Sequence, residues 1–165
     1  MSNVAARTDS ARLVVSEVVR PVDADPYAWL PFLDEQERYT LGWWTDCYHL
    51  REATGSRWFV ACHNGVEVGR VEVDAASGED YYMGSAVLGD GPILDIEFID
   101  VAVDFRRRGA ATAIVQHLIS AFPGHRLVAF SEDADAFWSS LGWLRIEHPD
   151  GDALYRPLFV QPLES

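Results

Sequence analysis

The sequence predicts a mixed α/β fold in one domain that spans residues 1–165. Two observations lead to this prediction. Between Leu94 and Phe122 an apolar, β-rich run changes into a segment with helical spacing, as expected where a buried strand is followed by a helix. Upstream, two strand-like segments flank Asn64-Gly65, the dipeptide that favours the type I′ turn of a hairpin. A hydrophobic content of 48% can supply the core of such a domain.

The first third of the chain carries weaker signals. Asp25 and Pro26 suit the N-cap and the first turn of a helix, whereas Pro31 limits that helix and Gly42 weakens the next one. In this part we expect a disordered N-terminus, one strand and two helices, at residues 1–10, 12–19, 25–33 and 35–52 respectively.

The rest of the chain alternates strands and helices. Residues 81–88 fit either an extra strand or part of an insert. Gly124 and Gly142 are typical helix ends, and Asp150-Gly151 is typical of a turn between strands. We expect a central strand that begins at Leu94, further strands over 57–63, 66–74, 126–130, 143–148 and 153–160, a loop over 74–80, and helices over 111–122 and 133–141.

The turn between the central strand and the next helix is a candidate anion site. It reads Phe105-Arg-Arg-Arg-Gly-Ala-Ala-Thr112, with Gly109 where the strand must turn into the helix. Free N–H groups and the positive helix end then point to one place, which suits a phosphate; a solvated basic turn is the alternative. The apolar stripe of the helix consists of Ala111, Ile114, Val115, Leu118, Ile119 and Phe122.

Two segments resemble the GCN5-related N-acetyltransferase (GNAT) family. Arg106, Gly109 and Ala111 match the Arg/Gln-x-x-Gly-x-Gly/Ala core of the family's acetyl-CoA signature. Downstream, Ala134-Asp-Ala-Phe-Trp-Ser-Ser-Leu-Gly-Trp143 is similar to the family's Ala-x-x-Phe-Tyr-x-x-Leu-Gly-Phe segment. The resemblance implies a mixed, centrally splayed sheet flanked by about four helices, with acetyl-CoA, the acyl donor, wedged in the splay.

The resemblance also implies which residues hold acetyl-CoA. The turn would bind the pyrophosphate through N–H groups and arginines, and the central strand would pair with the pantetheine arm through its backbone. Val103 stands where the family often has proline, and an extended conformation suits either residue. Phe137 would pack against the arm, with plain core packing as the alternative. The candidate cofactor-binding residues are Ile99, Val101, Ala102, Val103, Arg106, Arg107, Arg108, Gly109, Ala110, Ala111, Thr112 and Phe137.

Acetyl transfer to an amine requires a proton acceptor, because an alkylamine is protonated at neutral pH. Glu97 aligns with the glutamate that often serves the family in this role. Alternation along the strand places Asp95, Glu97 and, if no bulge intervenes, Ile99 on one face. Glu97 and Asp95 are therefore the candidate catalytic residues, with an ion pair or a cap at the sheet edge as the alternative. The carboxyl of Asp100 is a further candidate to face the acceptor.

One position departs from the family pattern. Trp138 stands where many members have the tyrosine that protonates the leaving thiolate, and an indole cannot act as a general acid. Ser131, Ser139, a water or another tyrosine would then supply the proton, or the step has no acid catalyst. Two functions follow: an N-acetyltransferase that moves acetyl from acetyl-CoA to a primary amine by direct attack, or a non-catalytic acyl-CoA-binding regulatory or sensor module.

The net charge of −13 argues against nucleic acid and membrane surfaces as partners, since both are polyanionic. It favours a cationic acceptor, such as a small-molecule amine or a peptide N-terminus. Aromatic side chains near the expected acceptor side suit an ammonium group, although core packing explains them as well. These residues are Trp43, Trp44, Tyr48, Tyr81 and Tyr82.

The remaining expectations concern metals, location and assembly. Cys47, Cys62 and the histidines show no metal-ligand spacing, so no metal site is expected. The sequence shows no signal peptide and no apolar run of membrane length, so we expect a cytoplasmic protein. The resemblance also allows a homodimer through the apolar final strands.

Overall fold

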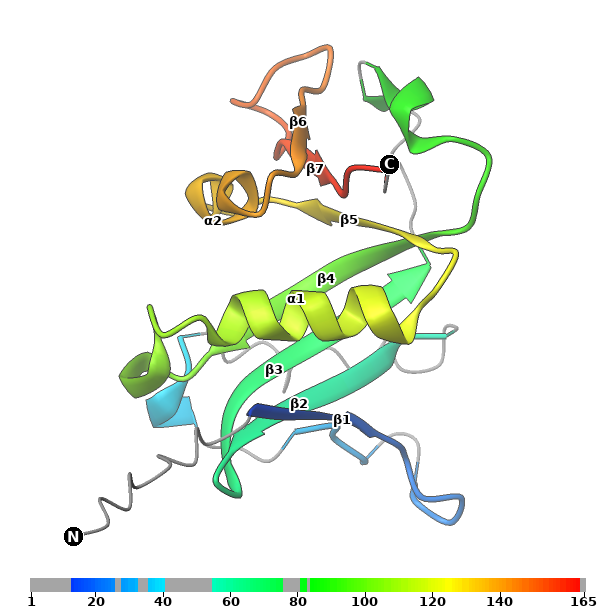
Figure 1. Cartoon of the computed structure of the whole chain (residues 1–165). Helices are drawn as coiled ribbons and strands as arrows, with labels where there is room; N and C mark the ends of the chain where they lie inside the picture. Colours follow the sequence, from blue (N-terminus) through cyan, green and yellow to red (C-terminus); the bar gives the residue numbers. More distant parts are fainter. Residues whose placement is uncertain are drawn as a thin grey trace, which may run out of the picture.

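A mixed seven-stranded sheet forms the centre of the described structure (Figure 1). The computed structural model describes residues 13–25, 28–32, 36–40, 55–75, 81, 82 and 84–163. The strands are β1 (Leu13–Val18), β2 (Arg57–His63), β3 (Val66–Ala75), β4 (Ile93–Val101), β5 (Arg126–Phe130), β6 (Leu144–Ile146) and β7 (Leu158–Val160). Their order is β1-β2-β3-β4-β5-β7-β6, and within it β4 and β5 form the parallel pair. The predicted mixed α/β fold is confirmed.

The described residues contain two α-helices, α1 (Ala110–Ala121) and α2 (Asp135–Ser140), and not the four expected. The helix predicted over 25–33 is wrong where it is described, because residues 28–32 form turns and bends around Pro31. The helix predicted over 35–52 is described only at 36–40, which hold the 3₁₀ turn η1 (Gln36–Arg38). Its remainder lies outside the described residues.

Other boundaries differ in small ways. Residues 81–88 form no strand where they are described, and η5 (Ser85–Leu88) is a 3₁₀ turn. The last strand starts at Leu158 rather than at 153, because the carbonyl of Gly151 accepts N–H groups of Leu154 and Tyr155, both at 3.2 Å, and closes a turn there. The predictions for residues 1–10 and for residues 76–80 of the loop lie outside the described residues.

The β2–β3 hairpin confirms its turn prediction. Asn64 and Gly65 have φ values of 52° and 78°, both positive, as a type I′ turn requires. The strands pair antiparallel from Arg57–Val73 to His63–Val66. Local sequence is therefore sufficient to place this element.

Helix α1 covers one face of the sheet and packs on β1, β3 and β4 (Figure 1). Ile114 and Leu118, from the predicted apolar stripe, are fully buried in this layer. Gly69 of β3 lies directly beneath Ile114, since a Cβ atom there would come within 2.7 Å of Ile114 Cδ1. The helix therefore sits close enough to the sheet to hold its N-terminus at one end of β4.

The sheet splits between β4 and β5. The ladder joins Ile93–Asp95 to Arg126–Val128 and ends there, after which β5 pairs with β7 on its other side. Parallel strands that separate in this way leave a gap in the middle of the sheet. The expected central splay is thus confirmed.

A β-bulge lies on β4 next to the split. Glu72 pairs with Phe98 and Asp74 with Asp95, so three residue steps on β4 face two on β3. The extra residue reverses the faces of the strand. Ile99 therefore joins the core cluster under α1 rather than the face that carries Asp95, because the condition for its expected alternation, a strand without a bulge, is not met.

Candidate active site

The N-terminus of α1 presents unoccupied backbone donors next to the split. Gly109 has φ 81° and precedes the helix without a side-chain cap. Within the described residues, the N–H groups from Gly109 to Thr112 donate to no backbone carbonyl, and the first return bond is from Ala113 N–H to Gly109 O at 3.0 Å. A Cβ atom on Gly109 would meet nothing within 4 Å. This open, positively polarised corner suits a phosphate.

The side chain of Arg106 points back into the protein. Its Nε donates to the carbonyl of Val101 at 2.9 Å, and its guanidinium donates to Asp100 Oδ1 at 3.1 Å and to the Thr40 hydroxyl. Asp100 is buried and also accepts the Thr40 N–H at 3.2 Å. The two side chains therefore hold the turn in shape, and the idea that Asp100 faces an acceptor is wrong. Arg107 and Arg108 remain exposed at the turn.

A cavity of about 100 Å³ occupies the split itself. Residues Ile96–Ile99 of β4 line one side. Across the gap, it is lined by Phe130, Glu132, Ala134, Trp138 and Arg156. It lies alongside the strand whose ladder with β5 has ended, which is where an extended chain can pair with the β4 backbone.

Some of the residues predicted to contact the pantetheine arm have backbone groups that are already hydrogen-bonded within the protein. Ile99 lines the split, but the Val101 carbonyl is taken by Arg106, and the Ala102 N–H donates to Val68 O at 2.9 Å. Val103 begins the 3₁₀ turn η6 (Val103–Phe105), so the extended conformation expected for it is wrong. Phe137 packs against the core and does not line this cavity.

A second cavity, of about 470 Å³, opens beside the split. Asp95 and Glu97 lie at its β4 side, and Glu97, Phe130 and Arg156 line both cavities. Its full lining is Tyr81, Tyr82, Asp95, Glu97, Phe130, His148, Leu154, Tyr155 and Arg156. A molecule held here would reach the split past Glu97.

The side chain of Glu97 is exposed at the edge of the cavity, and its pKa is raised. Burial raises its pKa most, and the charge of Asp74 raises it further, while Arg156 opposes both. The pKa of Glu72 is also raised, chiefly by burial and then by Glu97 and Asp74. Asp95 is 3% exposed. The strand register places these acids on the face of the sheet opposite α1, beside the split.

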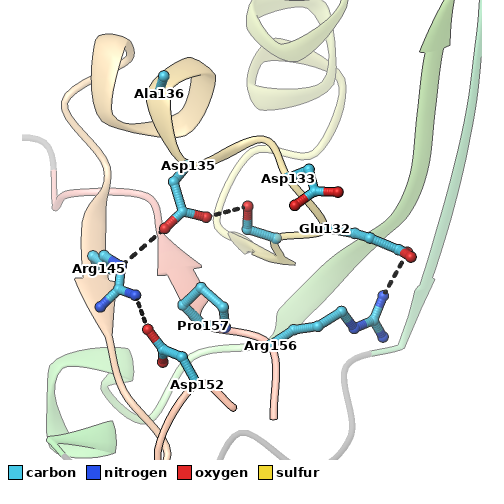
Figure 2. A pocket seen from close by; sticks show the side chains of 9 residues that line it. Glu132, Asp133, Asp135, Ala136, Arg145, Asp152, Arg156 and Pro157 are labelled. Carbon is cyan, nitrogen blue, oxygen red and sulfur yellow. Dashed lines mark hydrogen bonds and ion pairs between the residues drawn. The ribbon is translucent and has the colours of Figure 1, made fainter. Parts of the chain in front are cut away.

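A polar network lies on the far side of the split from β4 (Figure 2). Figure 2 shows Asp135 facing Arg145, which also reaches Asp152. Ser131 Oγ donates to Asp135 Oδ1 at 2.6 Å and accepts the Ala134 N–H at 3.2 Å. Because this hydroxyl proton is committed to a carboxylate whose pKa it lowers, Ser131 serves the start of α2 and is a poor proton donor for a leaving thiolate.

Trp138 fills the place expected for a tyrosine. It is 3% exposed, packs against Trp143 with ring centroids 4.8 Å apart, and lines the split. Its indole therefore forms part of the wall of the cavity and supplies no acid there.

The acetyltransferase (GNAT) family model matches residues 21–143. The chain belongs to this family. It is therefore a GNAT-type acyl-CoA N-acyltransferase by family, in agreement with the split sheet and the helix N-terminus described above. No curated protein sequence matches the chain.

Solved structures share the GNAT fold at low sequence identity. AtaT in complex with acetyl-methionyl-tRNAfMet is 15% identical, with a TM-score of 0.58, and 92% of this chain and 95% of that one are covered. AtaTR bound with acetyl-CoA is 13% identical, with a TM-score of 0.58 and coverage of 91% and 92%. An acetyltransferase from Exiguobacterium sp. 255-15, described as putative, is 19% identical, with a TM-score of 0.55 and coverage of 92% and 93%.

Sequence reasoning found part of this GNAT site and missed part. Tyr81 and Tyr82 line the second cavity as expected, while Trp43, Trp44 and Tyr48 lie outside the described residues. Five lining residues were not anticipated: Phe130, His148, Leu154, Tyr155 and Arg156. The turn signal at Asp150-Gly151 marks the reversal that brings His148 and Tyr155 together, but nothing in the spacing shows that this turn folds against β4.

No group of three or more His, Cys, Asp or Glu side chains in the described residues could hold a metal ion. Among the helices described, none has the length and apolar character needed to cross a membrane.

Proposed function

We propose that the protein transfers an acetyl group from acetyl-CoA to a primary amine by direct attack. The observation that carries this proposal is the position of the split. It opens after Asp95, with the free N–H groups of α1 at one end and the carboxyl of Glu97 in its wall. In this proposal, donors for a diphosphate and a base for an amine would border one gap.

The cofactor is proposed to lie along this gap. The N–H groups from Gly109 to Thr112, with the exposed Arg107 and Arg108, would bind the pyrophosphate. The pantetheine arm would follow Ile96–Ile99 into the split, as an added strand does at a sheet edge. This order places the thioester near Glu97.

Glu97 is proposed to accept the proton that the amine must lose, directly or through one water. The neutral nitrogen then attacks the thioester carbonyl, the C–N bond forms and the C–S bond breaks. The nitrogen gives up one more proton, and the leaving thiolate takes one. Asp95, buried beside Glu97 in the same cavity lining, is the second candidate.

A second function is favoured by Trp138. Because an indole lines the split where an acid is expected, a non-catalytic acyl-CoA-binding regulatory or sensor module is the alternative. Titration of acetyl-CoA by calorimetry, followed by thiol release with a panel of amines, separates the two. Binding without turnover of any amine would favour the module, and no binding would refute both.

Substitution of Glu97 tests the chemistry in the same assay. Glu97→Gln should lower kcat at least about 100-fold, the lower end of the range expected for loss of a general base, and should leave the affinity for acetyl-CoA unchanged. Asp90→Asn, a carboxylate-to-amide change in the turn before β4, is the matched control and should behave as wild type. Equal activity of Glu97→Gln and Asp90→Asn would refute the base assignment.

Two predictions about partners, that nucleic acid is not an acceptor and that the chain forms a homodimer, can also be tested. The net charge of −13 disfavours a nucleic-acid acceptor, yet AtaT is found with acetyl-methionyl-tRNAfMet, so methionyl-tRNA belongs in the amine panel. A homodimer stays a prediction, and sedimentation equilibrium of the whole chain tests it.

A further inference from the structure

The 470 Å³ cavity has an aromatic wall made of rings in mutual contact. Ring centroids are 5.4 Å apart between Phe130 and Tyr82, 5.2 Å between Tyr82 and His148, and 3.7 Å between His148 and Tyr155. The last pair is stacked at an angle of 24°. These contacts run across β5, the segment before η5 and the turn after β6, so three distant parts of the chain build one aromatic wall, in which Tyr82 meets Phe130 at 54° and His148 edge-on at 82°.

This wall is held in place by hydrogen bonds. The Tyr82 hydroxyl donates to the backbone carbonyl of Arg156 at 2.6 Å, and the Asp150 N–H donates to His148 Nδ1 at 3.1 Å. Because ring positions are set before any ligand enters, the surface can bind a flat apolar group without first ordering its own side chains.

The opposite side of the cavity is negative. Asp95 and Glu97 line it, with Asp74 close enough to raise the pKa of Glu97. The cation in the described lining, Arg156, lowers the pKa of Glu97, and its guanidinium also lies 3.7 Å from Glu132 and over the Phe130 ring at 5.9 Å. The described lining therefore combines two carboxyl groups with one guanidinium, which is shared with Glu132.

We propose that this cavity is the acceptor site and that it takes a primary amine carried on an aromatic ring by a short chain, without a carboxylate. The ring would lie against Tyr82, His148 and Tyr155, and the ammonium would point to Glu97 and Asp95. This inference rests on the proposed function and names its substrate class. The amine nitrogen then arrives beside Glu97, which borders both the cavity and the split.

Other acceptor classes fit this lining less well. A carboxylate on the acceptor would meet Asp95 and Glu97, while the guanidinium of Arg156 already has an acidic neighbour. A polyamine would leave the aromatic wall without a partner. A volume of about 470 Å³ is in the range of small-molecule sites, and a nucleic acid at the rim would face the acidic surplus.

The test measures kcat/KM by thiol release at saturating acetyl-CoA for 2-phenylethylamine, ethylamine, phenylalanine, spermidine and methionyl-tRNA. We expect 2-phenylethylamine to exceed each of the others at least about tenfold, as the contribution of a well-packed ring. In Tyr155→Ala the ratio of 2-phenylethylamine to ethylamine should fall about tenfold through a higher KM for the aromatic amine. Tyr155→Phe keeps the ring and should keep the ratio.

Several results would overturn this assignment while leaving acetyl transfer intact. These are equal or better use of ethylamine, spermidine or methionyl-tRNA, or a preference for phenylalanine that Arg156→Gln removes. If no amine is acetylated although acetyl-CoA binds, the proposed function fails instead. Calorimetric titration with 2-phenylethylamine then tests whether the cavity binds an aromatic amine. Binding heat in the wild type that is absent in Tyr155→Ala supports the site. No binding heat in the wild type, or equal heat in the wild type and Tyr155→Ala, refutes it. Tyr155 is 44% exposed, and circular dichroism of the variant checks that it folds.

Discussion

Replacement of Gly109 by alanine separates the cost of backbone strain from the loss of a ligand site. Gly109 has φ 81°, a left-handed conformation that costs an alanine about 1–2 kcal/mol of folding free energy. Its added Cβ would meet nothing within 4 Å, so no steric clash adds to that cost. We propose that the diphosphate occupies this open corner, so the added methyl group would compete with it for the same space. Loss of one charge-assisted hydrogen bond, worth about 1.5–3 kcal/mol, corresponds to a roughly 10- to 100-fold weaker affinity for acetyl-CoA.

The chain offers a matched control in Gly124. Its φ is 82°, a Cβ there would also meet nothing within 4 Å, and it follows the opposite end of α1. Gly124→Ala should therefore lose the same stability and keep its affinity for acetyl-CoA. Gly109→Asn should lose less stability than Gly109→Ala, because asparagine tolerates the left-handed conformation better, but its side chain still fills the corner and should weaken the affinity for acetyl-CoA.

Thermal unfolding gives the stability of each variant, and calorimetry gives its dissociation constant for acetyl-CoA. We expect equal destabilisation of the two alanine variants and weakened binding in Gly109→Ala and Gly109→Asn only. Wild-type affinity in both Gly109 variants would refute the placement of the diphosphate at the start of α1.

Three further substitutions test the site and its support. The pKa of Glu97 is raised in the folded protein, so the stability that its neutral form contributes is present below about pH 4.5 and is lost as the pH rises through the folded pKa. Glu97→Gln should therefore raise Tm relative to wild type at pH 7.5 and have little effect on Tm at pH 4. The same variant should lack the acid limb of the kcat/KM profile. Arg106→Ala removes the guanidinium that lies 3.1 Å from the buried carboxyl of Asp100 and should destabilise the fold by about 1–3 kcal/mol. The double variant Arg106→Ala/Asp100→Asn should recover part of this loss. Chemical denaturation measures the stability of both variants, and additive effects of the two substitutions would argue against coupling between the side chains. Gly69→Ala should cost about 1–3 kcal/mol by overpacking against Ile114 Cδ1, and Ile114→Val, which lacks that atom, should lessen the cost in a double-mutant cycle.

Where sequence prediction succeeded, the determining interactions are local. The turn at Asn64-Gly65 forms because its two residues accept positive φ angles, and the start of α1 follows from Gly109. The family signature around Gly109 lies on the same short segment. Each of these features depends on residues a few positions apart, so they can be read without knowledge of the remaining chain.

Where prediction failed, the cause is pairing between distant segments. Ile99 changes face because β3 imposes a bulge on β4, and Asp100 turns inward because Arg106 and the backbone of Thr40 bind its carboxyl. The apolar pattern of β4 predicts neither the bulge nor the inward orientation of the Asp100 side chain. In the same way, the expected extended conformation at Val103 yields to a 3₁₀ turn once the strand has ended at Val101.

By itself, the sequence determined the strand-to-helix unit that presents free N–H groups at Gly109, because backbone sterics and helix periodicity act over a few residues. Only the tertiary structure decided where β4 and β5 part, and that Tyr82, His148 and Tyr155 face Glu97 across one cavity. Those arrangements depend on long-range strand pairing and on the packing of separate turns, which the order of residues along one strand does not encode.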